Sequence, residues 1–237
     1  MCLSNIIKLK LFSTNSKLWC SDNGRMEHQK RVAIIVAHPD DEILWAGGTL
    51  INHPEWQCFV VCLCRKSDPD RAPRFYRVLD KIHAAGAMAD MDDGPEQRPL
   101  EHDEIQSTIK GLLPSNYYDL VISHSPAGEY TRHRHHEEIG KAVIDLWHNG
   151  QLDTAELWNF AYEDGGRKYL PRAIPTADFR FALTDDTWQK KYELITTEYN
   201  FSKDSWEART TPVAEAFWCF IDSLSAMKRL VAEQRLL

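Results

Sequence analysis

The sequence has no apolar run that approaches the roughly 18 residues a membrane-spanning helix requires. It also lacks a basic surplus, because 28 Lys and Arg residues stand against 35 Asp and Glu residues, for a formal net charge of −7. Nucleic acids and anionic membranes bind basic surfaces. We therefore expect neither a nucleic-acid partner nor a membrane span.

Cysteine is too sparse for a disulfide framework, with six residues in 237. Cys58, Cys62 and Cys64 share one parity along an apolar stretch, so they face the same side of a predicted strand. A soft-metal site is one interpretation, but buried thiols in a reducing compartment fit better. We expect a cytoplasmic protein.

The first 25 residues also lack the features of a signal peptide. Lys8 and Lys10 interrupt their short apolar patch, and no small-x-small cleavage site follows. We interpret residues 1–25 as a disordered tail or an over-extended start, and residues 26–237 as a single domain. The composition, 43% hydrophobic and 27% charged, is that of a globular protein with a proper core.

Apolar β-branched runs alternate with amphipathic segments along this domain. The expected strands are 31–37, 57–65, 119–123, 155–162 and 178–183, and the expected helices are 42–51, 74–85, 101–113, 137–147, 187–198 and 213–230. Alternation of this kind predicts an α/β fold, a Rossmann-like three-layer α/β/α arrangement around a mostly parallel sheet. In such sheets ligands bind at the carboxyl ends of the strands.

Two of those strand ends carry unusual residues. His38-Pro39-Asp40-Asp41-Glu42 follows the first buried strand. On a helical turn His38 and Asp41 project to one side, as two metal ligands would, while Asp40 stays free to take a proton. The plainer interpretation is a helix N-terminus whose acids suit the helix dipole.

The second strand end leads into a concentration of imidazoles. Four of the ten histidines lie between residues 124 and 136. His133 and His136 are three apart and share a face of any helical turn, whereas His135 is rotated away. A solvated helix start is the alternative. His124 and His135 are equally compatible with pocket residues and with surface imidazoles.

Together these positions supply the parts of a hydrolytic zinc site. Catalytic Zn²⁺ typically has three protein ligands and one open position for water, and His38, Asp41 and His136 are a two-His, one-carboxylate set. Asp40 is the candidate base for that water and His133 the candidate acid for a leaving amine. Metal, base and acid are what the hydrolysis of an unactivated amide requires.

The motifs also resemble a known family. Ala37 to Glu42, Gly47-Gly48-Thr49-Leu50, Gly128-Glu129-Tyr130 and His133-x-x-His136-x-x-x-Gly140 are similar to those of the PIG-L/LmbE-like zinc de-N-acetylases. The resemblance covers roughly residues 31–145. It implies a Rossmann-like fold, a zinc cofactor, a small acetylated amino-sugar or glycoconjugate substrate, and the same roles for the five residues above.

The resemblance further implies that Arg74 and Asp93 contact substrate. One departure concerns the tyrosine that family members often place two residues before the catalytic histidine, since Thr131 occupies that position and Tyr130 is one residue further away. Whether Tyr130 or Thr131 assists an oxyanion is therefore left open.

Rival functions are a zinc amidase that acts on a thiol conjugate, a phosphoesterase, and a non-catalytic Rossmann-like binding domain. A phosphoesterase usually needs two metals, and the sequence supplies ligands for one. A phosphate-binding domain would need a Gly-rich loop after the first strand, where this chain is acidic. The C-terminal aromatics Trp188, Trp206, Phe217 and Trp218 fit core packing best, with a sugar-binding wall or a homo-oligomer surface as alternatives.

Overall fold

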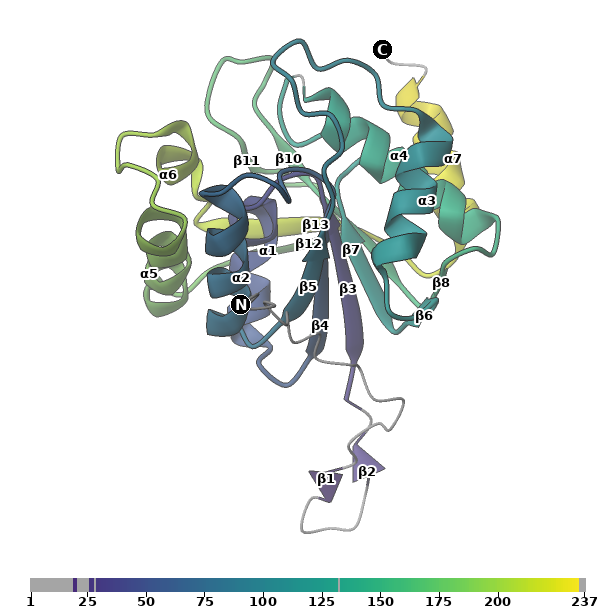
Figure 1. Cartoon of the computed structure of the whole chain (residues 1–237), viewed down its shortest axis with the longest axis horizontal. Coiled ribbons are helices and arrows are strands. Elements are labelled where there is room, and N and C mark those ends of the chain that lie inside the picture. The colour runs from purple at the N-terminus through teal and green to yellow at the C-terminus, as the bar shows by residue number, and fades with distance from the viewer. Residues whose placement is uncertain (1–18, 21–25, 28, 132, 235–237) are drawn as a thin grey trace, which may run out of the picture.

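A central sheet with helices on both faces organises the molecule (Figure 1). The computed structural model describes residues 19–20, 26–27, 29–131 and 133–234. The strand order is β12-β13-β9-β7-β3-β4-β5, parallel from β9 to β5 and antiparallel at the other two pairs. These strands are β3 (Arg31–Val36), β4 (Gln57–Cys62), β5 (Ala85–Met88), β7 (Leu120–Ser123), β9 (Leu157–Phe160), β12 (Phe179–Ala182) and β13 (Ala214–Phe220). The predicted α/β fold with a mostly parallel sheet is confirmed.

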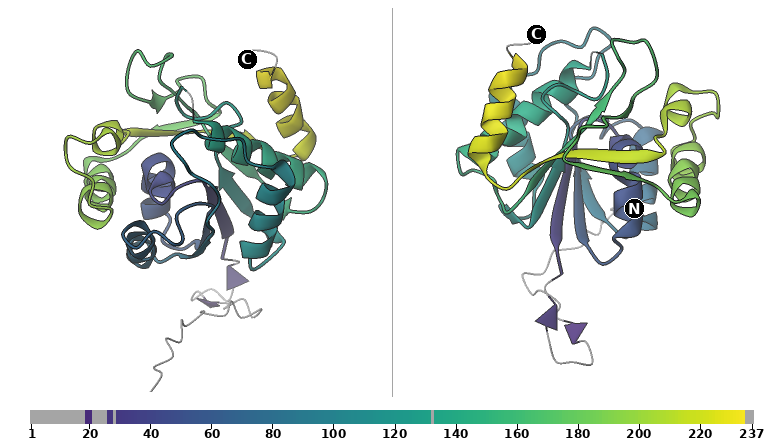
Figure 2. Two further views of the ribbon diagram at one scale, coloured as in Figure 1. Left: turned by 45° about the horizontal axis from the view of Figure 1, so that its top comes forward. Right: turned by 180° about the vertical axis from the view of Figure 1, so that it is seen from behind.

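Alternating side chains of β3 divide the core into two layers. Val32 and Ile34 pack with one group of helices, whereas Ala33 and Ile35 pack with the other. The first group is α1 (Asp41–Asn52), α2 (Arg71–Lys81), α5 (Asp185–Glu193), the π-helix η1 (Leu194–Glu198) and α6 (Trp206–Thr210). The second is α3 (His102–Leu112), α4 (Arg134–His148) and α7 (Ser223–Gln234). Figure 2 shows α5 and α6 at one side of the molecule and α7 at the other.

Three short antiparallel or parallel pairs lie outside the main sheet. They are β1 (Trp19–Cys20) with β2 (Met26–Glu27), β6 (Tyr117–Tyr118) with β8 (Asp153–Thr154), and β10 (Tyr162–Glu163) with β11 (Arg172–Ala173). Most of the predicted tail, residues 1–25, lies outside the described residues. Within the described part of the chain, none of the helices has the length and apolar character needed to cross a membrane.

Two sequence-based predictions of helices are wrong. Residues 213–230 do not form one helix, because Ala214–Phe220 is strand β13, paired on both sides, and only Ser223 onward is helical. Its Ala and Glu residues are good helix formers, but pairing between two strands overrides that weak preference.

The predicted helix 74–85 is also displaced. α2 runs from Arg71 to Lys81, and Gly86, expected to stop a helix, lies inside β5. A Cβ at Gly86 would lie 2.5 Å from both the carbonyl oxygen of Val60 and a methyl group of Leu79. Glycine is therefore required there for close packing of strand against helix.

The parallel strands deliver polar residues to one edge of the sheet. His38 follows β3, Asp93 lies on the loop after β5, and His124 directly follows β7. The N-termini of α1 and α4 begin at the same edge. The candidate site is built there, as the strand-end rule predicts.

Candidate metal-centred active site

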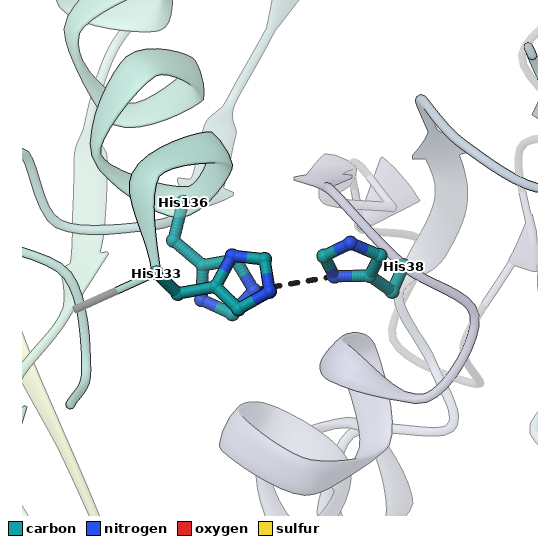
Figure 3. Close-up of side chains that lie close together, drawn as sticks. All are labelled: His38, His133 and His136. Atoms are coloured by element: carbon teal, nitrogen blue, oxygen red, sulfur yellow. Dashed lines mark hydrogen bonds between the residues drawn. The ribbon is translucent and has the colours of Figure 1, made fainter. Parts of the chain in front are cut away.

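Three of the predicted residues converge on one point. His38 Nδ1 lies 3.2 Å from Asp41 Oδ2 and 3.3 Å from His136 Nε2. His136 Nε2 lies 3.4 Å from the same Asp41 oxygen. Figure 3 shows the imidazole of His38 facing those of His133 and His136 across the gap between the α1 and α4 ends. One carboxylate and two imidazoles thus direct three ligand atoms at each other.

This spacing fits a zinc ion. Donor atoms about 2.0–2.1 Å from one tetrahedral Zn²⁺ lie roughly 3.3 Å apart. His124 and His133 approach the same point, since ligand atoms of Asp41, His124 and His136, and those of His38, His133 and His136, lie within 4.8 Å of one another. Histidine nitrogen and carboxylate oxygen are the donor set that zinc accepts in catalytic sites.

Neighbouring residues orient the side chains of His38 and Asp41. His38 Nε2 lies 3.0 Å from Asp93 Oδ1, and Arg65 binds the other oxygen of Asp93 at 2.5 Å. The indole of Trp45 donates to Asp41 Oδ1 at 3.0 Å, and the His38 backbone N–H donates to Asp41 Oδ2 at 2.9 Å. Carboxylate–histidine pairs of this kind fix the tautomer and orientation of a metal-ligating imidazole.

Glu129 holds the third side chain, and sequence analysis gave it no role. This buried carboxylate lies 2.6 Å from His136 Nδ1 and 3.0 Å from His124 Nδ1, and its other oxygen accepts the Ser125 N–H. The Ala37 N–H donates to His124 Nε2 at 3.0 Å. His124 thus contacts Glu129 through Nδ1, and its Nε2 faces the Ala37 N–H and, at 3.5 Å, Asp41 Oδ2. His136 keeps Nε2 directed at His38.

Electrostatics favour a charged Asp41. Burial opposes ionisation, but the imidazoles of His136 and His124 lower the pKa of Asp41 well below its usual range. Burial likewise lowers the pKa of His38 and His136, but hydrogen bonds and the charge of Asp41 outweigh it, so both pKa values rise. The charged carboxylate of Asp41 thus attracts both imidazoles.

The carboxylate of Asp40 does not cap the helix whose N-terminus it occupies. Asp40 is the N-cap residue of α1, yet its side chain makes no capping hydrogen bond. Its carboxylate instead lies 3.5 Å from the Arg71 guanidinium. Burial raises the pKa of Asp40 well above its usual range, against the opposing charge of Arg71, which is the direction a general base requires.

The two candidate acids are placed differently. The His133 ring centroid lies 4.1 Å from that of His136 and 4.7 Å from that of His38. His135 is wholly buried, binds Glu138 at 3.1 Å and lies 6.0 Å from the His133 ring. Burial and the neighbouring imidazoles lower the pKa of His133 to about 2, so its resting form here is neutral.

An aromatic wall of Tyr130, Trp45 and Trp206 borders the cluster. Tyr130 lies 5.5 Å from the His136 ring and 4.8 Å from the Trp206 ring. Thr131, in contrast, donates from Oγ1 to Asp164 at 2.7 Å and so anchors the loop. Of the two residues left open by the sequence, Tyr130 is the one that faces the imidazoles. Trp206, 37% exposed, was expected in the core.

The two residues assigned to substrate by resemblance have other partners. Arg74 donates to Asp70, the N-cap residue of α2, at 2.6 Å. Arg71, one turn earlier, is the α2 arginine that reaches Asp40. Asp93 uses its oxygens on His38 and Arg65. Because the predicted helix began at residue 74, Arg71 lay outside it and the sequence offered no signal for this contact.

Comparison with known proteins agrees with this geometry. Residues 33–147 match the PIG-L family, described as GlcNAc-PI de-N-acetylase. The match contains every residue of the cluster and confirms the resemblance predicted from the motifs. Over residues 33–147, just under half of the chain, this protein resembles the PIG-L family of de-N-acetylases.

Individual relatives are distant. An uncharacterised protein of Acanthamoeba polyphaga mimivirus is 24% identical over 188 residues, 73% of this chain and 80% of that protein. The N,N'-diacetylchitobiose deacetylase of Pyrococcus horikoshii superposes with a TM-score of 0.61 at 17% identity, covering 82% of this chain and 85% of that one.

The 4-carboxy-2-hydroxymuconate hydratase GalB of Pseudomonas putida superposes with a TM-score of 0.56 at 16% identity, covering 81% of this chain and 96% of that one. A deacetylase and a hydratase therefore share this fold. Likeness of fold alone does not select the reaction, and the argument for function must come from the site.

Proposed function

We propose that this chain is a cytoplasmic zinc-dependent hydrolase that removes an N-acetyl group from a small amino-sugar-type substrate. The observation that carries the proposal is the mutual spacing of 3.2–3.4 Å among His38 Nδ1, Asp41 Oδ2 and His136 Nε2. These three residues would hold the zinc ion. When bound, zinc acts as a Lewis acid and lowers the pKa of a coordinated water towards ~7.

The residues around the cluster divide the remaining work. Asp40, with its raised pKa and buried carboxylate, takes a proton from the attacking water. Arg71 limits that rise and orients the carboxylate. Asp93 keeps His38 in the tautomer that presents Nδ1 to the cluster, and Glu129 does the same for Nε2 of His136. We assign Asp93 this orienting role; contact of Arg74 with substrate stays a prediction.

His133 completes the reaction at the leaving nitrogen. Its neutral imidazole can donate a hydrogen bond to the oxygen that becomes negative as water attacks the amide. That negative charge offsets the repulsion from the neighbouring imidazoles, so His133 can receive the proton that Asp40 took from the water and pass it to the amine. Tyr130 and Trp206 form the wall against which the substrate lies.

The test is zinc content and turnover of His136→Ala. We expect the variant to lose bound zinc and hydrolysis of an N-acetylglucosamine substrate together, because one of three ligands is gone. His148→Ala, at the far end of the same helix, is the matched control and should keep both. One zinc per folded chain in His136→Ala would refute the ligand set. Acetylated thiol conjugates assayed beside the sugars test the rival amidase.

A further inference from the structure

The backbone of Asp40 adopts a conformation that glycine favours. Its φ is +133°, a region that other residues enter only when their surroundings hold them there. The Asp40 N–H donates to Oε2 of Glu42 at 3.2 Å. Glu42 is wholly buried. A buried carboxylate two residues along thus ties down the turn that carries the candidate base.

The other oxygen of Glu42 has a partner far away in the sequence. The Tyr199 hydroxyl donates to Oε1 of Glu42. Tyr199 is 2% exposed and immediately follows the π-helix η1 (Leu194–Glu198). Its own N–H donates to the Leu194 carbonyl at 2.9 Å, so the backbone of Tyr199 is fixed to η1. Single π-helical turns inside helices are frequent at functional sites.

Residues 199–201 are also linked to the side chain of Asp40, through Arg71. The Arg71 guanidinium lies over the Phe201 ring, 4.8 Å from its centroid, and 3.5 Å from Asp40 Oδ1. Backbone and carboxylate of one residue are therefore each linked to residues 199–201, through Glu42 in one case and Arg71 in the other. Only the first link is a continuous chain of hydrogen bonds.

We propose that Glu42 and Tyr199 are positioning residues that hold Asp40 in the orientation needed for proton abstraction. The inference rests on the proposed role of Asp40 as base. A base must lie within hydrogen-bond reach of the proton it removes, and a displacement of about 1 Å can reduce the rate by about 10²-fold. Without the Tyr199 hydroxyl, Glu42 loses the partner that fixes its carboxylate beneath the Asp40 N–H.

Tyr199→Phe removes that hydroxyl and keeps the ring. We expect kcat to fall roughly 10-fold or more, with KM and zinc content unchanged, because the ligands and the aromatic wall are untouched. Tyr192→Phe is the matched control: Tyr192 lies in α5, where its ring stacks on Trp188 at 5.0 Å. Equal kcat in Tyr199→Phe and wild type would overturn the proposal.

A double-mutant cycle with Asp40→Asn separates positioning from general destabilisation. If Tyr199 acts through Asp40, Tyr199→Phe should cause no further loss of kcat in the Asp40→Asn background. An equal loss in both backgrounds would overturn the positioning role and leave the proposed function standing. Wild-type kcat in Asp40→Asn alone would instead refute the proposed base, and this inference with it.

Discussion

Helix α1 contacts two buried polar clusters. In the first, which we call the closed cluster, the polar groups of Glu215 and its neighbours have hydrogen-bond partners; in the second, the open cluster at Asp41, a buried nitrogen has none among the described residues. In the second half of α1, Gly48 and Thr49 donate their N–H groups to the two oxygens of Glu215, each at 2.7 Å. Lys191 binds the same carboxylate at 2.7 Å, and neither Lys191 nor Glu215 is exposed to solvent. At the N-terminus of α1, in contrast, Nδ1 of His133 is buried without a partner among the described residues.

This difference in hydrogen bonding indicates which of the two clusters binds a cation or substrate. A buried charge needs a partner and hydrogen bonds to be tolerated, and Glu215 has both. The cluster at Asp41 instead directs three ligand atoms at one another and leaves further imidazoles beside them. A closed cluster stabilises the fold, whereas an open one gains its stabilising partner only when a cation or substrate arrives. The predictions below test that division.

The largest expected effect is on stability, from Glu215→Ala. The change leaves Lys191 charged and buried, together with two backbone N–H groups. Breaking a buried ion pair costs about 3–5 kcal/mol, which for a domain of this size corresponds to a fall in Tm of about 10 °C. Thermal unfolding measures it, and zinc per folded chain should not change.

The control is Glu193→Ala, which removes an exposed carboxylate from α5. Surface changes of this kind usually stay within about 0.5 kcal/mol. If Glu215→Ala melted with the control, or lost zinc while remaining folded, the separation between the two clusters would be wrong.

The sequence could predict the open cluster because its members lie next to recognisable strands. His38 follows an apolar run directly, and His133 and His136 share one helical turn. Their approach across 98 residues follows from the rule that parallel strands bring their carboxyl ends to one edge. The spacing of these residues and the fold class together were sufficient to predict that they lie close to one another.

The closed cluster could not be predicted in this way. Glu215 meets Gly48 across 167 residues, from a strand that the sequence had assigned to a helix. Tyr199 and Trp206 reach the site from segments with no motif of their own. Tertiary packing decides which of several similar aromatic or acidic residues faces the site. Local periodicity in the sequence does not predict that choice.

The second prediction compares His133 with His135. His133→Ala should lower kcat by about 10²-fold, the lower range for loss of an acid–base group, while zinc content stays near that of wild type. His135→Ala should be almost normal, because His135 is bound to Glu138 and directed away from the cluster. Steady-state turnover on one acetylated amino sugar measures both, and the reverse ranking would exchange the two roles.

The smallest expected effect concerns how tightly the open cluster holds its ion. Glu129 receives the imidazole N–H groups of His124 and His136 at one oxygen and the Ser125 N–H at the other. In Glu129→Gln one side of the group becomes an NH₂, which cannot accept, so either Ser125 or the two imidazoles lose their acceptor. With the NH₂ toward the imidazoles, His136 loses the contact that fixes its tautomer.

We expect the Kd for zinc to rise 10–100-fold, the usual range when a supporting carboxylate behind a metal ligand is lost. Competition with a chelator of known affinity measures it. The matched control is Glu138→Gln, which alters the carboxylate bound to His135 on the same helix and should leave the Kd unchanged. Equal weakening in both variants would mean that general loss of negative charge, rather than orientation of His136, controls zinc affinity.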